Sequence, residues 1–379
     1  FQLGASFDLG KIFGLNGGFF HMTFVRDYGH GLSHDVTGTF TKAQEIYKNE
    51  FDITRLGVFA YEQKLFDNKL DIFVGRLGST TFYGRLTNSC YFQSGLTCSV
   101  PQILNSSSGV TFPTSATWGG NVRYWLRPDS YLEAGAFEVN QYIQQTHGFD
   151  FSTSRATGFS VPFEFSKGIY DLDKERYPGV FKIGGYVSTP VLNDIFYNTK
   201  NQSIALFGGK ARPYSGYRRG AYIMGEKAIW RPSDDASRSL AVFGGWIKPL
   251  ESEEVMNSQV YGGLALRAPF ASRPHDIISF EANWYQLSSK EQAFLRDSRI
   301  KAGGSGINSR NEFVFEADYN ALVYRSVRLA PNVSYYIHPD NSALPRAPFV
   351  PKNLLVFGVK LTINFTGLLG LPLAPNLSD

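Results

Sequence analysis

Apolar and polar side chains alternate strictly along one segment of this chain after another. In the last of these segments, one phase holds Leu355, Phe357, Val359, Leu361, Ile363 and Phe365, and the other holds Lys360, Thr362 and Asn364. A period of two residues is typical of a β-strand with one apolar and one polar face. Because this pattern recurs with almost no helical periodicity, it indicates a transmembrane, antiparallel, up-and-down β-barrel, apolar toward lipid and polar toward a lumen.

The alternation and the turn residues between the segments predict about 15 strands. We expect them over 1–8, 20–24, 54–63, 69–76, 118–126, 131–138, 159–166, 181–188, 221–230, 240–247, 259–267, 278–284, 312–320, 327–337 and 355–365. Charged and amide groups on the polar face of 312–320 would be unusual in a dry core but suit a water-filled lumen.

The connections between the expected strands alternate between short and long. Short ones lie around Asn16, Asp67, Pro128, Asp235, Ser272 and Tyr324, and long polar ones include 78–117, 140–157, 189–218 and 286–310. Short periplasmic turns and long outer loops are typical of bacterial barrels, so the pattern predicts the outer membrane of a Gram-negative bacterium. Such barrels close with even strand numbers, so we expect about 16 strands, the first of them missing from this chain.

The last expected strand is followed by a segment that cannot continue it. Gly367, Gly370 and Pro372 break the alternation. We therefore expect a barrel over 1–365 and a non-barrel tail over 366–379, placed in the periplasm. The Leu-rich character of the tail makes it a candidate for contact with a periplasmic protein.

Composition narrows the function classes. Charged residues make up 18% of the chain and the net charge is +4, which gives no basic footprint for nucleic acid. No uninterrupted apolar run reaches the roughly 18 residues of a membrane helix. The six histidines are scattered, and the chain has no nucleophile elbow, phosphate loop or zinc-protease spacing. We therefore expect no enzyme activity, no cofactor and no metal.

The chain has two cysteines, Cys90 and Cys98, in a segment rich in Ser, Asn and Gly. In a loop of an exported protein such a pair predicts a disulfide. Metal ligation is the alternative, but no histidine flanks either cysteine.

Several segments together resemble a known family. They are Ile53–Leu56, Tyr61–Phe66, Val74–Leu77, the two cysteines, Pro113 with Trp118-Gly119, Val161–Phe165, Tyr177–Tyr186, Arg273–Asp276 and Val333–Pro339. In combination they resemble the carbohydrate-selective OprB porins over nearly the whole chain. The resemblance implies a 16-stranded outer-membrane barrel with a central constriction that passes glucose and other monosaccharides by diffusion. The chain departs from the family pattern in lacking the opening segment and in extending beyond Phe365, the expected barrel-closing residue.

A sugar-selective constriction needs planar donors, carboxylate acceptors and aromatic faces that bind weakly enough to release the solute. Our candidates are Arg55, Arg76 and Arg123 facing Glu62 and Glu164, with Lys182, Glu281 and Glu316 further round the wall. Arg55 and Arg123 lie on the polar face of their strands, whereas Arg76 and Glu62 are assigned through the resemblance. The alternative is that these charges brace each other without touching solute.

Other features leave further alternatives open. Trp125, Tyr186 and Tyr336 are candidate stacking platforms, although packing in the barrel wall is the commoner role of such aromatics. Segment 78–117 either folds into the barrel and narrows it or forms an exposed cap. The function expected is diffusion of monosaccharides. The alternatives are a channel for small organic anions or polyols, and a barrel that anchors a periplasmic partner through its tail.

Overall fold

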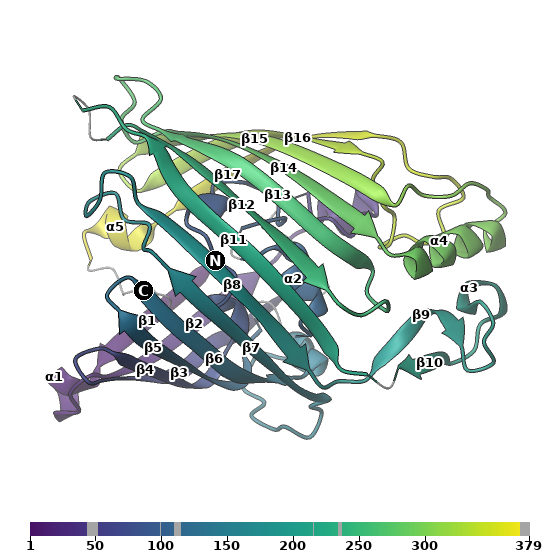
Figure 1. The fold of residues 1–379 in the computed structure, drawn as a ribbon, viewed down its shortest axis with the longest axis horizontal. Helices are drawn as coiled ribbons and strands as arrows, with labels where there is room; N and C mark the ends of the chain where they lie inside the picture. The colour runs from purple at the N-terminus through teal and green to yellow at the C-terminus, as the bar shows by residue number, and fades with distance from the viewer. Residues whose placement is uncertain (44–51, 99, 110–114, 215, 234–236, 372–379) are drawn as a thin grey trace.

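The computed structural model describes residues 1–43, 52–98, 100–109, 115–214, 216–233 and 237–371. The expected turn around Asp235 and the end of the tail, 372–379, lie outside these ranges. Figure 1 shows strands running obliquely around an interior that holds the short helix α2 (Gln102–Ser107).

Fifteen strands form one antiparallel sheet, which confirms the number expected from the alternation. Each strand pairs with its neighbours along the chain, except that β8 pairs with β11 across the segment that contains β9 and β10. The strands are β1 (Gln2–Asp8), β2 (Gly18–Asp27), β3 (Ile53–Leu65), β4 (Leu70–Leu77), β5 (Thr117–Arg127), β6 (Ser130–Val139), β7 (Gly158–Lys167), β8 (Gly179–Ser188), β11 (Arg218–Trp230), β12 (Ser239–Pro249), β13 (Met256–Arg267), β14 (Ile277–Leu287), β15 (Asn311–Tyr324), β16 (Val327–Ile337) and β17 (Leu354–Ile363).

The order begins at β1 and ends at β17, and no pairing joins these two strands within the described ranges. The sixteenth strand expected ahead of Phe1 stays a prediction. The last expected strand, 355–365, was too long at its end, because β17 ends at Ile363 and Phe365 begins α5 (Phe365–Leu369). The side chain of Asn364 caps this helix by accepting a hydrogen bond from the Gly367 N–H at 3.0 Å, so the chain turns helical there.

The two faces of the strands differ as the alternation predicts. Phe163 and Ile183 each have 49% of their surface exposed on the outer face, whereas their neighbours Glu164 and Lys182 are 2% and 8% exposed. A continuous outer band of large apolar side chains, with charged groups inside, is the arrangement expected of a barrel in lipid. None of the described helices is long and apolar enough to cross a membrane.

Two long connections contain structure that the sequence pattern did not predict. Residues 189–217 hold the hairpin β9 (Leu192–Asn198) and β10 (Ala211–Tyr214) with α3 (Ile204–Phe207) between them, and residues 288–310 hold α4 (Ser289–Lys301). Figure 1 shows all four elements at one end of the barrel. Lys290 of α4 joins them by donating to Asp194 of β9 at 2.9 Å. Polar side chains occupy most positions of α4, so the sequence shows no apolar stripe by which the helix could be predicted.

Candidate functional site

Residues 78–98, 100–109 and 115–116, here called the inserted loop, fold into the barrel lumen rather than forming an exposed cap. Its helix α2 lies inside the sheet in Figure 1, and Phe92 and Leu96 of the loop are fully buried. Their apolar neighbours include Phe243 and Tyr261 on the inner faces of β12 and β13. The question left open by the sequence is thereby answered in favour of insertion, and the loop narrows the passage.

One side of the inserted loop is held by carboxylates of β7 and β11. Glu164 accepts a hydrogen bond from the Gly84 N–H at 2.8 Å. Glu226 accepts from the backbone N–H groups of Thr87 and Asn88, and from the Asn88 amide group, each at 2.8 Å. Backbone N–H groups bonded to a carboxylate make charge-assisted bonds, which are stronger than neutral ones.

The other side of the inserted loop is held by carboxylates of β14 and β15. Glu316 accepts from the N–H groups of Gln93 and Ser94 at 2.8 and 3.1 Å. Glu281 accepts from the hydroxyls of Thr97 and Ser94 at 2.5 and 3.2 Å. Glu281 and Glu316 are also direct partners in the strand register. Three of the four predicted carboxylates, Glu164, Glu281 and Glu316, therefore hold the loop.

Lys182 of β8 balances one of these carboxylates. Its Nζ lies 2.9 Å from Glu164 Oε1 and 3.0 Å from the Tyr131 hydroxyl. Tyr222 donates to the other oxygen of Glu164 at 2.8 Å. Because the carboxylate and the ammonium are both buried, they form a desolvated ion pair. Removing either partner would leave the other as an uncompensated buried charge.

Arg123 has a carboxylate partner that the sequence analysis missed. Its Nε lies 3.2 Å from Glu133 Oε1 on β6, directly opposite in the strand register. The guanidinium carbon lies 4.6 Å from the ring centroid of Tyr131. The two charges compensate each other on the lumen wall. The alternation in 131–138, which puts Glu133 in the same phase as Tyr131, was the signal that could have identified it.

Arg55 and Arg76 contact loops rather than carboxylates. Arg76 donates to the carbonyl groups of Gly148 and Ala116 at 2.9 and 2.7 Å, and Arg55 donates to the Ser115 hydroxyl. Each arginine is 1% exposed. They hold the last residues of the inserted loop, and Arg76 also holds the connection between β6 and β7.

Glu62 faces the interior although it shares a phase with Leu56 in the sequence. In the register Phe24 pairs with Leu56 and Thr23 with Val58, so Gly57 is an extra residue in β3 that reverses the phase. Glu62 then lies 2.8 Å from His21 Nε2 and 3.2 Å from Lys64 Nζ. A bulge of this kind leaves no clear mark in the alternation.

The remaining sequence candidates lie in packed surroundings. Tyr186 and Tyr336 are 2% and 1% exposed, and Trp125 packs edge-on against Tyr131 with ring centroids 5.1 Å apart. The Sγ atoms of Cys90 and Cys98 lie 2.6 Å apart. Their disulfide stays a prediction, which peptide mapping without reductant will check.

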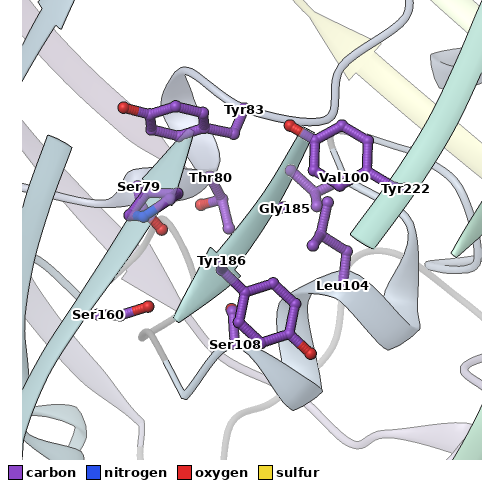
Figure 2. Close-up of a pocket in the computed structure, with 11 residues that line it drawn as sticks. Ser79, Thr80, Tyr83, Val100, Leu104, Ser108, Ser160, Gly185, Tyr186 and Tyr222 are labelled. Carbon is purple, nitrogen blue, oxygen red and sulfur yellow. The ribbon is translucent and has the colours of Figure 1, made fainter. Parts of the chain in front are cut away.

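A cavity lies between the inserted loop and strands β7, β8 and β11 (Figure 2). Hydroxyl groups of Thr80, Ser160 and Tyr186 are among its lining. It offers about 20 Å³ to the centre of a water-sized sphere, which suits one water molecule and is far too small for a sugar ring.

In the connection between β14 and β15, α4 carries a carboxyl group with a perturbed pKa. Burial raises the pKa of Glu291 to about 7, and the negative charge of Asp340 acts in the same direction. Because this folded-state pKa lies above the unfolded value of about 4.3, the packing of α4 is stabilised at low pH. That stabilisation is lost as the pH rises through about 7.

We therefore expect the amide protection of α4 to fall by at least about tenfold between pH 5 and pH 8, after correction for intrinsic exchange. Hydrogen exchange followed by mass spectrometry measures this change, with peptides of β16 as the internal reference. Glu291→Gln should remove the pH dependence. Equal pH dependence in the wild type and this variant would contradict the assignment.

Taken together, a fifteen-stranded sheet with an apolar outer face and a loop anchored inside its lumen defines the class of protein, an outer-membrane channel. A family model described as the carbohydrate-selective porin OprB family matches residues 1–365. The chain belongs to this family, and it is therefore a porin of the Gram-negative outer membrane, not an enzyme.

Individual relatives agree with this assignment. Porin B of Pseudomonas aeruginosa is 26% identical over 385 residues, covering 96% of this chain and 81% of the relative. The putative porin QuiX of Acinetobacter baylyi is 25% identical over 357 residues, covering 89% of this chain and 77% of that protein. The high-pH structure of Pseudomonas putida OprB superposes with a TM-score of 0.82 at 25% identity, covering 95% of this chain and 86% of that one.

Proposed function

We propose that this porin passes neutral monosaccharides such as glucose, and that solute is selected along the lumen-facing side of the inserted loop. The observation that carries the proposal is the way the loop is held. Its turns are bonded to Glu164, Glu226, Glu281 and Glu316, so these carboxylates are already engaged with protein donors. Solute then meets side chains of the loop itself.

The side chains of the inserted loop that keep part of their surface exposed include those of Arg85, Thr87, Tyr91 and Gln93. They offer a planar cation, a hydroxyl, an aromatic ring and an amide, which are groups that replace water around sugar hydroxyls and cover a ring face. None of the four was among the predicted site residues, because only the insertion of the loop brings them to the lumen.

Arg85 is the member of this group with the strongest support. It follows Gly84, which is bonded to Glu164, and lies two residues before Thr87, which is bonded to Glu226. Both anchors are on the inner face, so Arg85 lies inside the barrel. One of its nitrogens donates to the Thr81 carbonyl at 3.0 Å, which leaves further donors for solute.

Liposome swelling with the purified protein tests the proposal. Glucose, arabinose, a disaccharide and an amino acid similar in size to glucose are compared. The proposal expects glucose to enter faster than the size-matched amino acid. Equal entry of all small solutes would indicate a general porin, and faster entry of small organic anions or polyols would favour the alternative specificity.

Arg85→Ala is expected to lower the rate of glucose entry several-fold relative to arabinose while the folded barrel is retained. The guanidinium supplies donors that must be matched to one solute geometry, so its loss affects discrimination more than total conductance. Arg346→Ala, at an exposed position of the connection before β17, is the matched control. Unchanged entry rates in Arg85→Ala would remove Arg85 from the site.

We further propose that the apolar outer band contacts outer-membrane lipid and lipopolysaccharide, and that tail 366–379 docks a periplasmic protein. Within the described part of the tail, Leu369 and Leu371 are 69% and 54% exposed. Co-purification of a periplasmic protein with the full chain, and its loss when 366–379 is removed, is the expected result. Retention of the same partner by the shortened chain would contradict the docking role.

A further inference from the structure

Arg76 carries its charge on the outer face of the barrel, yet it is buried. It shares its phase on β4 with Val74, which is 55% exposed, and it lies directly opposite Phe59 on β3 and Trp118 on β5. No register shift interrupts either pairing, so the Arg76 side chain lies on the outer face rather than in the lumen, where the sequence analysis expected it. Its exposed fraction is nevertheless 1%. A cation that would otherwise face lipid is therefore covered by another part of the chain.

The cover is a segment of the connection between β6 and β7, residues 147–151, here called the outer strap. The ring of Phe151 lies over the Arg76 guanidinium, with its centroid 5.2 Å from the guanidinium carbon. The same ring packs against the rings of Phe59 and Trp118, with centroids 5.9 and 6.0 Å apart, and the Trp118 indole N–H donates to the Phe151 carbonyl at 3.0 Å. The outer strap thus lies on the outside of the barrel, whereas the inserted loop lies inside.

The outer strap also completes the wall where β4 is too short. The register pairs β3 with β4 only from Phe59 onward, so residues 53–58 have no partner on β4. This gap exists because the chain turns into the lumen after Leu77, where β4 ends. The Leu56 N–H donates instead to the His147 carbonyl at 2.9 Å. The outer strap therefore replaces the strand pairing that the inserted loop takes away.

The guanidinium of Arg76 joins the outer strap to the inserted loop. Its Nη1 donates to the carbonyl groups of Gly148 and Asp150 in the outer strap. Its Nη2 donates at 2.7 Å to the carbonyl of Ala116, the last residue of the inserted loop before β5. A planar guanidinium binds several acceptors in a fixed geometry, so it fixes the two segments relative to each other. Hydrogen bonds from a charged donor are also stronger than neutral ones.

We propose that Arg76 is a positioning residue for the constriction that acts from the outer face of the barrel. It holds the outer strap in the gap beside β3 and, through Ala116, fixes the end at which the inserted loop returns to the sheet. Without it, the outer strap leaves β3 and the returning end of the inserted loop moves. This role requires no contact between Arg76 and solute, and it does not depend on which sugar the porin passes.

The test combines planar-bilayer recording of Arg76→Ala with hydrogen exchange followed by mass spectrometry. We expect amide exchange in 54–58 and 147–151 to rise at least about tenfold, because charge-assisted bonds are lost, and the open-channel current noise to rise several-fold. Arg76→Lys keeps a cation that can donate to the same carbonyls, so we expect it to restore most of the quiet current. Arg127→Ala, at an exposed position of β5, is the matched control. Faster exchange in Arg76→Ala with wild-type current noise would overturn the proposal, because the outer strap would then complete the wall without positioning the inserted loop.

A second variant covers the case in which Arg76→Ala fails to fold. Gly148 has φ +77°, and a Cβ at this position would lie 2.5 Å from the Leu56 carbonyl oxygen. Gly148→Val should therefore lift the outer strap from β3 while Arg76 stays in the chain. We expect the same faster exchange and the same rise in current noise. Wild-type current noise in this variant would overturn the proposal.

Discussion

Replacing Glu226 with alanine is expected to raise single-channel conductance severalfold and to abolish discrimination between glucose and a disaccharide. Glu226 receives three hydrogen bonds from Thr87 and Asn88, and two of them come from backbone N–H groups. Each bond to a charged group contributes about 1.5–3 kcal/mol, and their loss leaves buried donors without a partner. The inserted loop would therefore leave the lumen wall for a large part of the time.

Planar-bilayer recording measures the conductance, and liposome swelling measures the discrimination. Glu226→Gln is the informative partner variant, because an amide oxygen still accepts one bond, and we expect an intermediate effect. Glu175→Ala, at an exposed position of the connection between β7 and β8, is the control. Wild-type conductance in Glu226→Ala would show that this carboxylate does not hold the constriction.

Alternation of side chains was sufficient to predict the sheet. The strand number and the lumen phase of most strands followed from it, because lipid outside and water inside impose opposite requirements on successive residues. Glu164 and Lys182 could be placed inside for this reason. Glu226 was available by the same criterion, since it shares its phase with Tyr222 and Met224, but no resemblance pointed to it.

The alternation could not predict what each inner residue contacts. The bonds from Thr87 to Glu226 and from Gln93 to Glu316 span 139 and 223 residues, and nothing local to either end specifies them. The bulge at Gly57 and the cap of α5 at Asn364 depend on single residues that fit several conformations. Whether a charged lumen side chain contacts solute or a loop therefore depends on tertiary contacts, which the sequence pattern does not specify.

The inserted loop determines how the charges of the barrel wall are used. Arg55, Arg76, Glu164, Glu226, Glu281 and Glu316 all bond to it. A constriction built in this way has wall charges that are engaged by the loop, so its selectivity depends on the fewer side chains that stay exposed. Such a surface binds weakly, which a diffusion channel needs in order to release its solute.

The ion pair of Glu164 and Lys182 leads to the largest expected effect on stability. Glu164→Ala removes the carboxylate next to a buried ammonium and also leaves the Tyr222 hydroxyl and the Gly84 N–H without their acceptor. Breaking a buried pair by removing one partner costs about 3–5 kcal/mol. We expect a free energy of unfolding lower by that amount, measured by urea unfolding in lipid vesicles with tryptophan fluorescence.

The double variant Glu164→Gln with Lys182→Met separates the charge effect from the loss of packing. It removes both charges, keeps side chains of similar volume, and retains an amide oxygen for the Gly84 N–H. Replacing a buried ion pair by uncharged groups of similar size is often neutral, so we expect it to recover most of the lost stability. If the double variant is as unstable as Glu164→Ala, then the unpaired ammonium is not the cause of the loss, and the ion pair itself stabilises the fold. If Glu164→Ala itself unfolds like the wild type, the ammonium of Lys182 must find another acceptor in the lumen.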